Sequence, residues 1–175
     1  DSTLLVDGVN NKIVGAVDTT SLRTSETKIA LGNSAGETTQ GGSAVAVGNL
    51  AGQTTQGASA VAIGSAAGYT GQGGSAVAVG YSAGLTTQGA NAIAVGYSAG
   101  NTTQGVEAVA IGRLAGTTAQ GNNAVAVGPY AGQTTQGGSA VAVGRQAGDT
   151  SQGANAIAVG VYAGKTTLHH QHNLV

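Results

Sequence analysis

The stretch GGSAVAVGNLAGQTTQ, residues 41–56, recurs in register along most of this chain. A degenerate earlier copy covers residues 25–40. Further copies of sixteen residues begin at Gly57, Gly73, Gly89, Gly105, Gly121, Gly137 and Gly153. Self-similarity at a fixed period is typical of solenoids and repeat arrays. We therefore expect a repeat domain over residues 25–168, built from about nine units.

Each copy begins with a short run in which Ala alternates with β-branched residues, as in Val45-Ala46-Val47, and then reaches Gly48. Alternation at period two indicates a β-strand with two different faces. A helix is excluded, because glycine recurs every four to seven residues and each one would cost about 1 kcal/mol relative to Ala. Each copy is predicted to be one coil of an all-β parallel solenoid, with coils stacked about 4.8 Å apart. The recurring glycines predict positive φ angles or close approach of neighbouring coils.

The two faces of the strand differ in side-chain size, and this difference predicts which face lies inside. A sixteen-residue coil encloses little volume, which suits Ala44, Ala46 and Ala51. The Val/Ile face would then point outward as one continuous apolar stripe, larger than a soluble monomer tolerates, so it would need a partner. A monomeric solenoid with Val and Ile inside and Ala outside is the alternative.

Composition and charge narrow the function classes. Charged residues are 7% of the chain and the net charge is −1, which argues against a surface for nucleic acid or anionic membranes. The chain has no Cys, which excludes disulfides and thiolate metal sites. The apolar runs are far too short to span a bilayer, so any membrane link would have to come from other segments. The acidic residues are scattered and no glycine-rich stretch has the phosphate-loop pattern, so we expect no enzyme.

The two ends lie outside the repeat. Residues 1–24 contain short β-rich runs, Thr3–Val6 and Lys12–Val17, separated by turn signals, and they are predicted to form a cap or junction. Residues 169–175 are expected to be an exit from the solenoid or the start of a further element. Within them, His170 and His172 are spaced as ligands for a transition metal on the axis of a trimer, but a polar cap or an irregular exit from the solenoid is the preferred explanation. We expect no other cofactor.

The run Asn91-Ala92-Ile93-Ala94-Val95-Gly96 and its copies resemble the repeated motif of the YadA-like head domain of trimeric autotransporter adhesins. Similar coils occur in phage tail fibres and in fibre proteins of large DNA viruses. The resemblance covers residues 25–168 and implies a left-handed β-roll in which three chains pack their Val/Ile stripes around one axis. The implied interface residues are Ile29, Leu31, Val45, Val47, Val61, Ile63, Val77, Val79, Ile93, Val95, Val109, Ile111, Val125, Val127, Val141, Val143, Ile157 and Val159.

For function, the resemblance implies an extracellular fibre on a bacterial surface or a virion, which attaches to a host cell receptor, a matrix protein or a glycan. The ninth, tenth and thirteenth columns of the repeat vary on an otherwise constant scaffold, and exposed Tyr and Arg are favoured in recognition surfaces. The candidate ligand-binding residues are Tyr69, Tyr81, Tyr97, Arg113, Tyr130, Arg145 and Tyr162. The alternative is that these columns vary because they face solvent, which does not constrain the residue type.

Two other functions stay open. One is a structural filament or fibre shaft without a ligand of its own. The other is an ice-binding solenoid, because Thr recurs every sixteen residues from Thr38 to Thr166. Most of these threonines are followed by a second Thr, and adjacent strand residues are expected to point to opposite faces. A flat Thr array is therefore not expected, and we predict hydrogen bonds of the Thr and Gln side chains between stacked turns instead.

Overall fold

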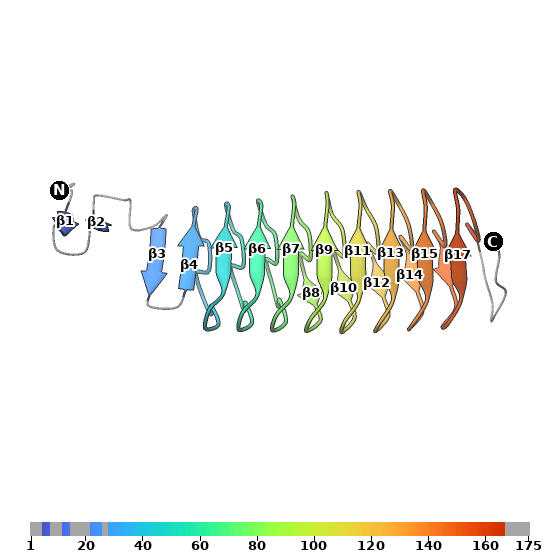
Figure 1. Cartoon of the computed structure of the whole chain (residues 1–175), viewed down its shortest axis with the longest axis horizontal. Coiled ribbons are helices and arrows are strands. Elements are labelled where there is room, and N and C mark those ends of the chain that lie inside the picture. Colours follow the sequence, from blue (N-terminus) through green and yellow to red (C-terminus); the bar gives the residue numbers. More distant parts are fainter. Residues whose placement is uncertain (1–4, 8–11, 15–21, 26–27, 167–175) are drawn as a thin grey trace.

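The chain forms a rod of about eight stacked coils of about sixteen residues each, which Figure 1 shows side by side along the long axis. The computed structural model describes residues 5–7, 12–14, 22–25 and 28–166, with side chains from residue 28 onward. The regular elements of these described residues are all β-strands. The predicted all-β parallel solenoid is confirmed.

A sheet of ten strands runs the length of the rod and faces the viewer in Figure 1. In spatial order its strands are β17 (Ile157–Val159), β15 (Val141–Val143), β13 (Val125–Val127), β11 (Val109–Ile111), β9 (Ile93–Val95), β7 (Val77–Val79), β6 (Val61–Ile63), β5 (Val45–Val47), β4 (Lys28–Leu31) and β3 (Leu22–Ser25). From β4 to β17 the pairing is parallel, and each residue pairs with the one sixteen positions away, as Val61 pairs with Val77. The sequence period is therefore the structural register.

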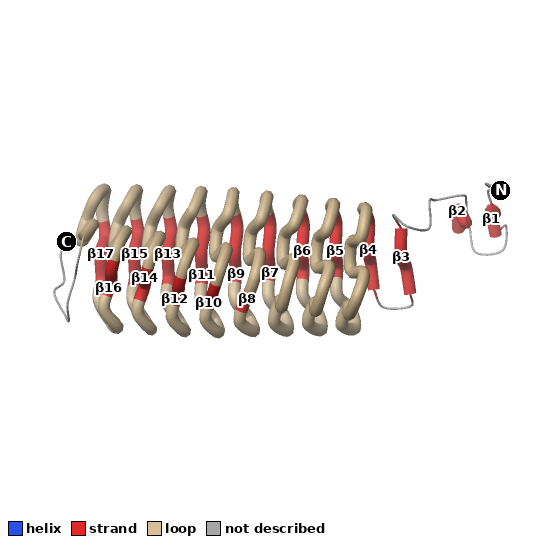
Figure 2. The backbone as a smooth tube through the Cα atoms, turned by 180° about the vertical axis from the view of Figure 1, so that it is seen from behind, coloured by secondary structure: helices blue, strands red, loops and turns tan. Residues whose placement is uncertain are grey.

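A second, narrower sheet lies on the other side of the rod, where Figure 2 shows it from behind. Its strands are β8 (Thr87–Gln88), β10 (Thr103–Gln104), β12 (Ala119–Gln120), β14 (Thr135–Gln136) and β16 (Ser151–Gln152). In the preceding coils only single parallel bridges continue it, from Gln40 through Gln56 to Gln72. Thr55 and Gly71 have φ angles of 114° and 74°, which no extended strand accommodates.

The interior of the rod is built from alanine, as predicted. Ala44, Ala46 and Ala51 are 0% exposed, while Val45 and Val47 lie outward and are half-buried. The same division holds in the later coils. The alternative orientation, with Val and Ile inside, is therefore wrong. Side chains larger than Ala would not fit at these alanine positions, where the interior is closely packed.

The largest interior side chain is the Gln that closes each coil. The Gln56 Nε2 donates to the carbonyl oxygens of Val45 at 2.8 Å and Ala60 at 3.3 Å, so it ties one wall of the coil to the next turn. The predicted bonding of Gln between stacked turns is found between Gln120 and Gln136, at 3.1 Å. In other coils Gln joins stacked turns through other partners, because each closing Nε2 also donates to a carbonyl of the next coil and Gln53 donates to Glu37 at 2.7 Å. Most of the buried Oε1 atoms have no partner.

Two residues per coil outside the glycine columns adopt left-handed backbone angles and close the coil. In residues 41–56 these are Ser43, with a φ of 59°, and Leu50, with a φ of 60°. The strand therefore begins at Val45 rather than at Ser43, where the alternation begins in the sequence. A left-handed conformation costs a residue with a Cβ about 1–2 kcal/mol, so these turns are strained in every coil.

Glycine is required at the eighth position of each copy because neighbouring coils touch there. Gly96 has a φ of 131°, and a Cβ added to it would lie 2.7 Å from the carbonyl oxygen of Gly112 in the next coil. Gly42 provides a contrast, because nothing lies within 4 Å of a Cβ added there. The copies also carry Ala58 and Ala90 in the Gly42 column.

We therefore expect Gly96→Ala to lower the free energy of unfolding by about 3 kcal/mol or more, since backbone strain and displacement of the next coil add together. Gly42→Ala is expected to change it by less than about 1 kcal/mol. Denaturant titration followed by circular dichroism measures both. Equal stability of the two variants would show that the coils do not meet through this column.

The N-terminal segments differ from the coils, as expected of a cap or junction. β1 (Leu5–Asp7) and β2 (Lys12–Val14) pair antiparallel with each other, close to the predicted strands Thr3–Val6 and Lys12–Val17. β3 pairs antiparallel with β4, so the first coil does not present an open strand edge on that side. Pairing of this kind protects a solenoid from uncontrolled edge-to-edge addition.

Candidate functional site

The first candidate surface is the outer face of the ten-stranded sheet, which carries the eighteen predicted interface residues in two columns. We call it the apolar stripe. Its residues Ile29, Leu31, Ile63, Ile93, Ile111, Ile157 and Val159 are 36–46% exposed, and the other members are half-buried. The strands from β5 to β17 in this sheet contain only Val, Ile and Ala. The stripe is thus continuous and uncharged over most of the rod.

The second candidate surface is the turn that follows each strand of this sheet. Tyr81 and Tyr97 stack there, with ring centroids 5.3 Å apart and an angle of 13° between the planes. The guanidinium carbon of Arg113 lies 4.4 Å from the centroid of the Tyr130 ring. Neighbouring coils supply the two members of each pair. A stacked pair and a cation–π pair therefore each join two successive coils along this edge.

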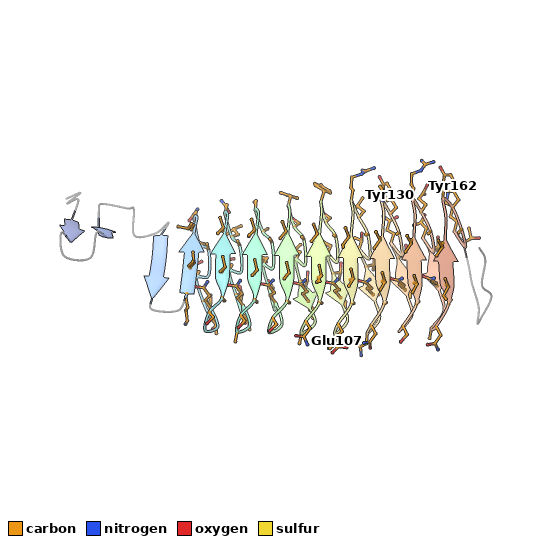
Figure 3. All side chains as sticks on the ribbon, in the orientation of Figure 1. Glu107, Tyr130 and Tyr162 are labelled. Atoms are coloured by element: carbon orange, nitrogen blue, oxygen red, sulfur yellow. The ribbon has the colours of Figure 1, made fainter. Side chains whose placement is uncertain are left out.

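The same arrangement returns two coils further along. The guanidinium carbon of Arg145 lies 4.6 Å from the Tyr162 ring centroid, and the Lys165 Nζ lies 5.3 Å from the same centroid. We call the set Tyr81, Tyr97, Arg113, Tyr130, Arg145, Tyr162 and Lys165 the outer ridge. Figure 3 shows Tyr130 and Tyr162 projecting from one long edge of the rod, with Glu107 on the opposite edge.

Six of the seven predicted ligand-binding residues belong to the outer ridge, and Tyr69 does not. Tyr69 is half-buried and makes none of the ring contacts described above. Lys165 joins the ridge although the prediction left it out. Lys165 stands in the thirteenth column, one of the variable columns of the repeat. The sequence does not reveal that a side chain in this column reaches the Tyr ring in the tenth column.

The Thr columns depart from the prediction. Thr86 and Thr87 are both exposed, as are Thr102 and Thr103, so adjacent threonines do not point to opposite faces. The chain bends at Thr86 and the two-residue strand begins at Thr87, so strict alternation does not extend across the pair. Two outward Thr columns consequently lie side by side, with Gly71, Ala119 and Ser151 interrupting the second.

His170 and His172, the candidate metal ligands, lie outside the described residues. Across the part of the chain that the structure describes, no helix is long and apolar enough to cross a membrane. No protein-family model, curated protein or solved structure matches the chain. The two surfaces must therefore be interpreted from their own chemistry.

Proposed function

We propose that the chain is a non-enzymatic fibre head that assembles as a homotrimer through the apolar stripe and attaches an extracellular surface to a host cell, matrix or glycan. The observation that carries the proposal is the outward Val/Ile face. Apolar surface gains about 25 cal/mol for each Å² removed from water. A continuous stripe longer than the patches usual on monomers therefore favours association.

A parallel solenoid with a straight apolar stripe suits a closed symmetric assembly. The same face of each copy can meet at a common axis, and rotation about that axis closes the contact without leaving a free stripe. The number three comes from the resemblance to YadA-like heads, as does the placement on a bacterial surface or a virion. The outer ridge lies on a turn edge rather than on the stripe, so receptor contacts and assembly use different residues.

The rod is also suited to transmitting the load of an attachment. Backbone hydrogen bonds run from coil to coil around the whole circuit, as from Gly64 N to Val47 O at 2.8 Å and from Gly68 N to Ala83 O at 2.9 Å. Such nearest-neighbour bonding makes a stiff, one-dimensional stack. Few groups in the coils titrate, so the assembly is expected to keep its strength over a wide pH range.

The test of assembly is the molar mass in dilute solution, from light scattering on a size-exclusion column. We expect three times the 16.6 kDa of one chain. A single-chain mass would contradict the proposal at its first step. Binding to panels of cells, matrix proteins and glycans tests attachment separately. A trimer that binds none of them would instead be a structural filament or shaft.

A monomeric ice-binding solenoid is the second candidate, because both Thr columns face outward. Spacing along each column follows the stacking of coils, at about 4.8 Å. This candidate requires a single-chain mass together with thermal hysteresis of the freezing point. A trimeric mass without hysteresis would exclude it.

A further inference from the structure

We propose that the outer ridge binds an extended acidic polysaccharide that carries one anionic group per disaccharide, with the sugar chain lying along the rod. The inference names a ligand class for the attachment role proposed above and rests on that role. From Tyr81 onward every coil contributes at least one aromatic or cationic side chain to the ridge, from its ninth or its tenth column. In the earlier coils the ninth column holds Asn33, Asn49 and Ser65.

The distance between like side chains along the ridge indicates the class of ligand. Arg113 and Arg145 are two coils apart, which corresponds to about 9.6 Å along the rod. Tyr130 and Tyr162 are separated by the same two coils. One guanidinium and one phenol ring therefore recur together, at about the length of one disaccharide in an extended polysaccharide. A ligand of this period would meet one cation and one ring in each repeat.

The contacts within the ridge leave the cations available. A guanidinium that stacks on a ring, as that of Arg113 does on Tyr130, keeps its N–H donors at the edge of the plane. Those donors suit bidentate binding of a carboxylate or a sulfate. The rings offer flat surfaces for the C–H faces of sugars, and the exposed fractions of Tyr81 and Tyr97 are 55% and 53%.

One of the described negative charges lies at the ridge, and the others lie away from it. Among the side chains that the structure describes, Glu107 is on the opposite edge and Glu37 is in the first coil. Asp149 lies at the ridge, because its carboxylate accepts a hydrogen bond at 3.2 Å from Gln146, which stands in the same column as Tyr130 and Tyr162. The described residues include no ion pair with Arg113 or Arg145, so both guanidinium groups keep N–H donors for an anionic ligand.

Tyr130 and Tyr162 occupy a backbone position that is left-handed in every coil, as it is at Leu50. Tyr130 and Tyr162 both have a φ of 61°, in the left-handed region that bulky side chains rarely adopt. Asn or Gly would adopt these angles with less strain. The angle is therefore a property of the coil, and what distinguishes these two coils is that each ring meets a guanidinium from the preceding coil.

The experiment measures affinity for two polymers by biolayer interferometry, using the whole chain. Hyaluronan presents carboxylate as its anionic group, and keratan sulfate presents sulfate. Dextran, which is neutral, is the control polymer. We expect the chain to bind at least one acidic polymer and not dextran, with affinity falling as salt is raised. Preference between the two polymers identifies the anionic group.

Variants locate the binding on the ridge. Replacing Arg113→Gln and Arg145→Gln together is expected to weaken binding by about tenfold or more. Tyr97→Ala is expected to weaken it by about threefold to tenfold. The matched control is Lys28→Gln, which removes a cation far from the ridge and should leave affinity unchanged. The molar mass of each variant is measured in parallel, so loss of assembly is distinguished from loss of a ligand contact.

Five outcomes would overturn the inference. Equal binding of dextran would show that charge plays no part, and equal loss in Lys28→Gln would show that the cations act without a specific site. Tighter binding of a single-stranded oligonucleotide would make the ridge a phosphate groove. If neither acidic polymer binds while cells or matrix proteins still do, the ligand class is wrong and attachment stands. If nothing binds at all, both proposals fail.

Discussion

Replacing Ile93→Asp and Val95→Asp together is expected to convert the proposed trimer into single folded chains. Both residues lie in the middle of the apolar stripe, in register with Val77 and Val79 on one side and with Val109 and Ile111 on the other. Closing three copies around an axis would bury two carboxylates from each copy. Each buried, unpaired carboxylate costs several kcal/mol, which exceeds what the neighbouring Val and Ile contacts recover.

The coil itself should survive this change. Ile93 is 36% exposed in the single chain, and Val95 is half-buried, so carboxylates at these positions can reach water without entering the alanine interior. Circular dichroism should therefore show the same β spectrum while light scattering shows one third of the mass. If the Asp variant unfolds as well as dissociates, loss of the fold cannot be separated from loss of the interface. The pair Ile93→Thr with Val95→Thr then tests the interface, because it makes the stripe less apolar without adding charge.

The matched control replaces Thr102→Asp and Thr103→Asp, because these exposed residues belong to the same coil but lie on the other side of the rod. This variant should remain trimeric. Acid provides a second check. Burial raises the pKa of a carboxyl, so association of the stripe variant should return below about pH 4 and be lost as the pH rises. A stripe variant that stays trimeric at neutral pH would exclude the Val/Ile face as the interface.

The sequence predicted the repeat, its register and the inward direction of alanine because each depends on period and side-chain size alone. Val45, Ala46 and Val47 alternate at period two, and a sixteen-residue circuit has room only for the small member. The sequence also predicted that the glycine columns would have positive φ angles or touch a neighbouring coil. Gly96 meets the backbone of the next coil through its missing Cβ, and its φ is positive.

Other features depended on backbone geometry that a residue pattern does not contain. The exposure of both Thr86 and Thr87 follows from a bend between them and the preceding turn, whereas alternation assumes a straight strand. The pairing of Arg113 with Tyr130 depends on how the ninth and tenth columns project from a left-handed turn. Periodicity therefore predicted the scaffold of the candidate site, and local backbone angles decided which side chains meet on it.

Replacing Gln104→Glu is expected to lower the free energy of unfolding at neutral pH by more than about 3 kcal/mol, although the two side chains have nearly the same shape. Gln104 is 1% exposed, and its Nε2 donates to the carbonyl oxygens of Ile93 at 2.7 Å and Ala108 at 3.2 Å. An ionised carboxylate would replace both donations with repulsion between oxygens. It would also bury a charge without a partner.

The direction of the pH dependence distinguishes this cause from a loss of packing. Burial raises the pKa of the introduced carboxyl above its value of about 4.3 in the unfolded chain. Stability is therefore best recovered below that unfolded pKa, where the acid can donate one hydrogen bond, and it is lost as the pH rises through the folded pKa. Thermal unfolding at about pH 4 and about pH 8 should show the variant approaching the parent only in acid.

Two further variants separate the loss of the amide donors from the effect of a buried charge. Gln104→Leu removes the donors without adding charge, so its stability should fall between that of the parent and that of Gln104→Glu at neutral pH, with no dependence on pH. Thr103→Glu places the same carboxyl on the neighbouring exposed residue of β10 and should be nearly neutral. If Gln104→Glu unfolds at the same temperature in acid and at neutral pH, the interior Gln column does not hold the coil closed by its amide donors.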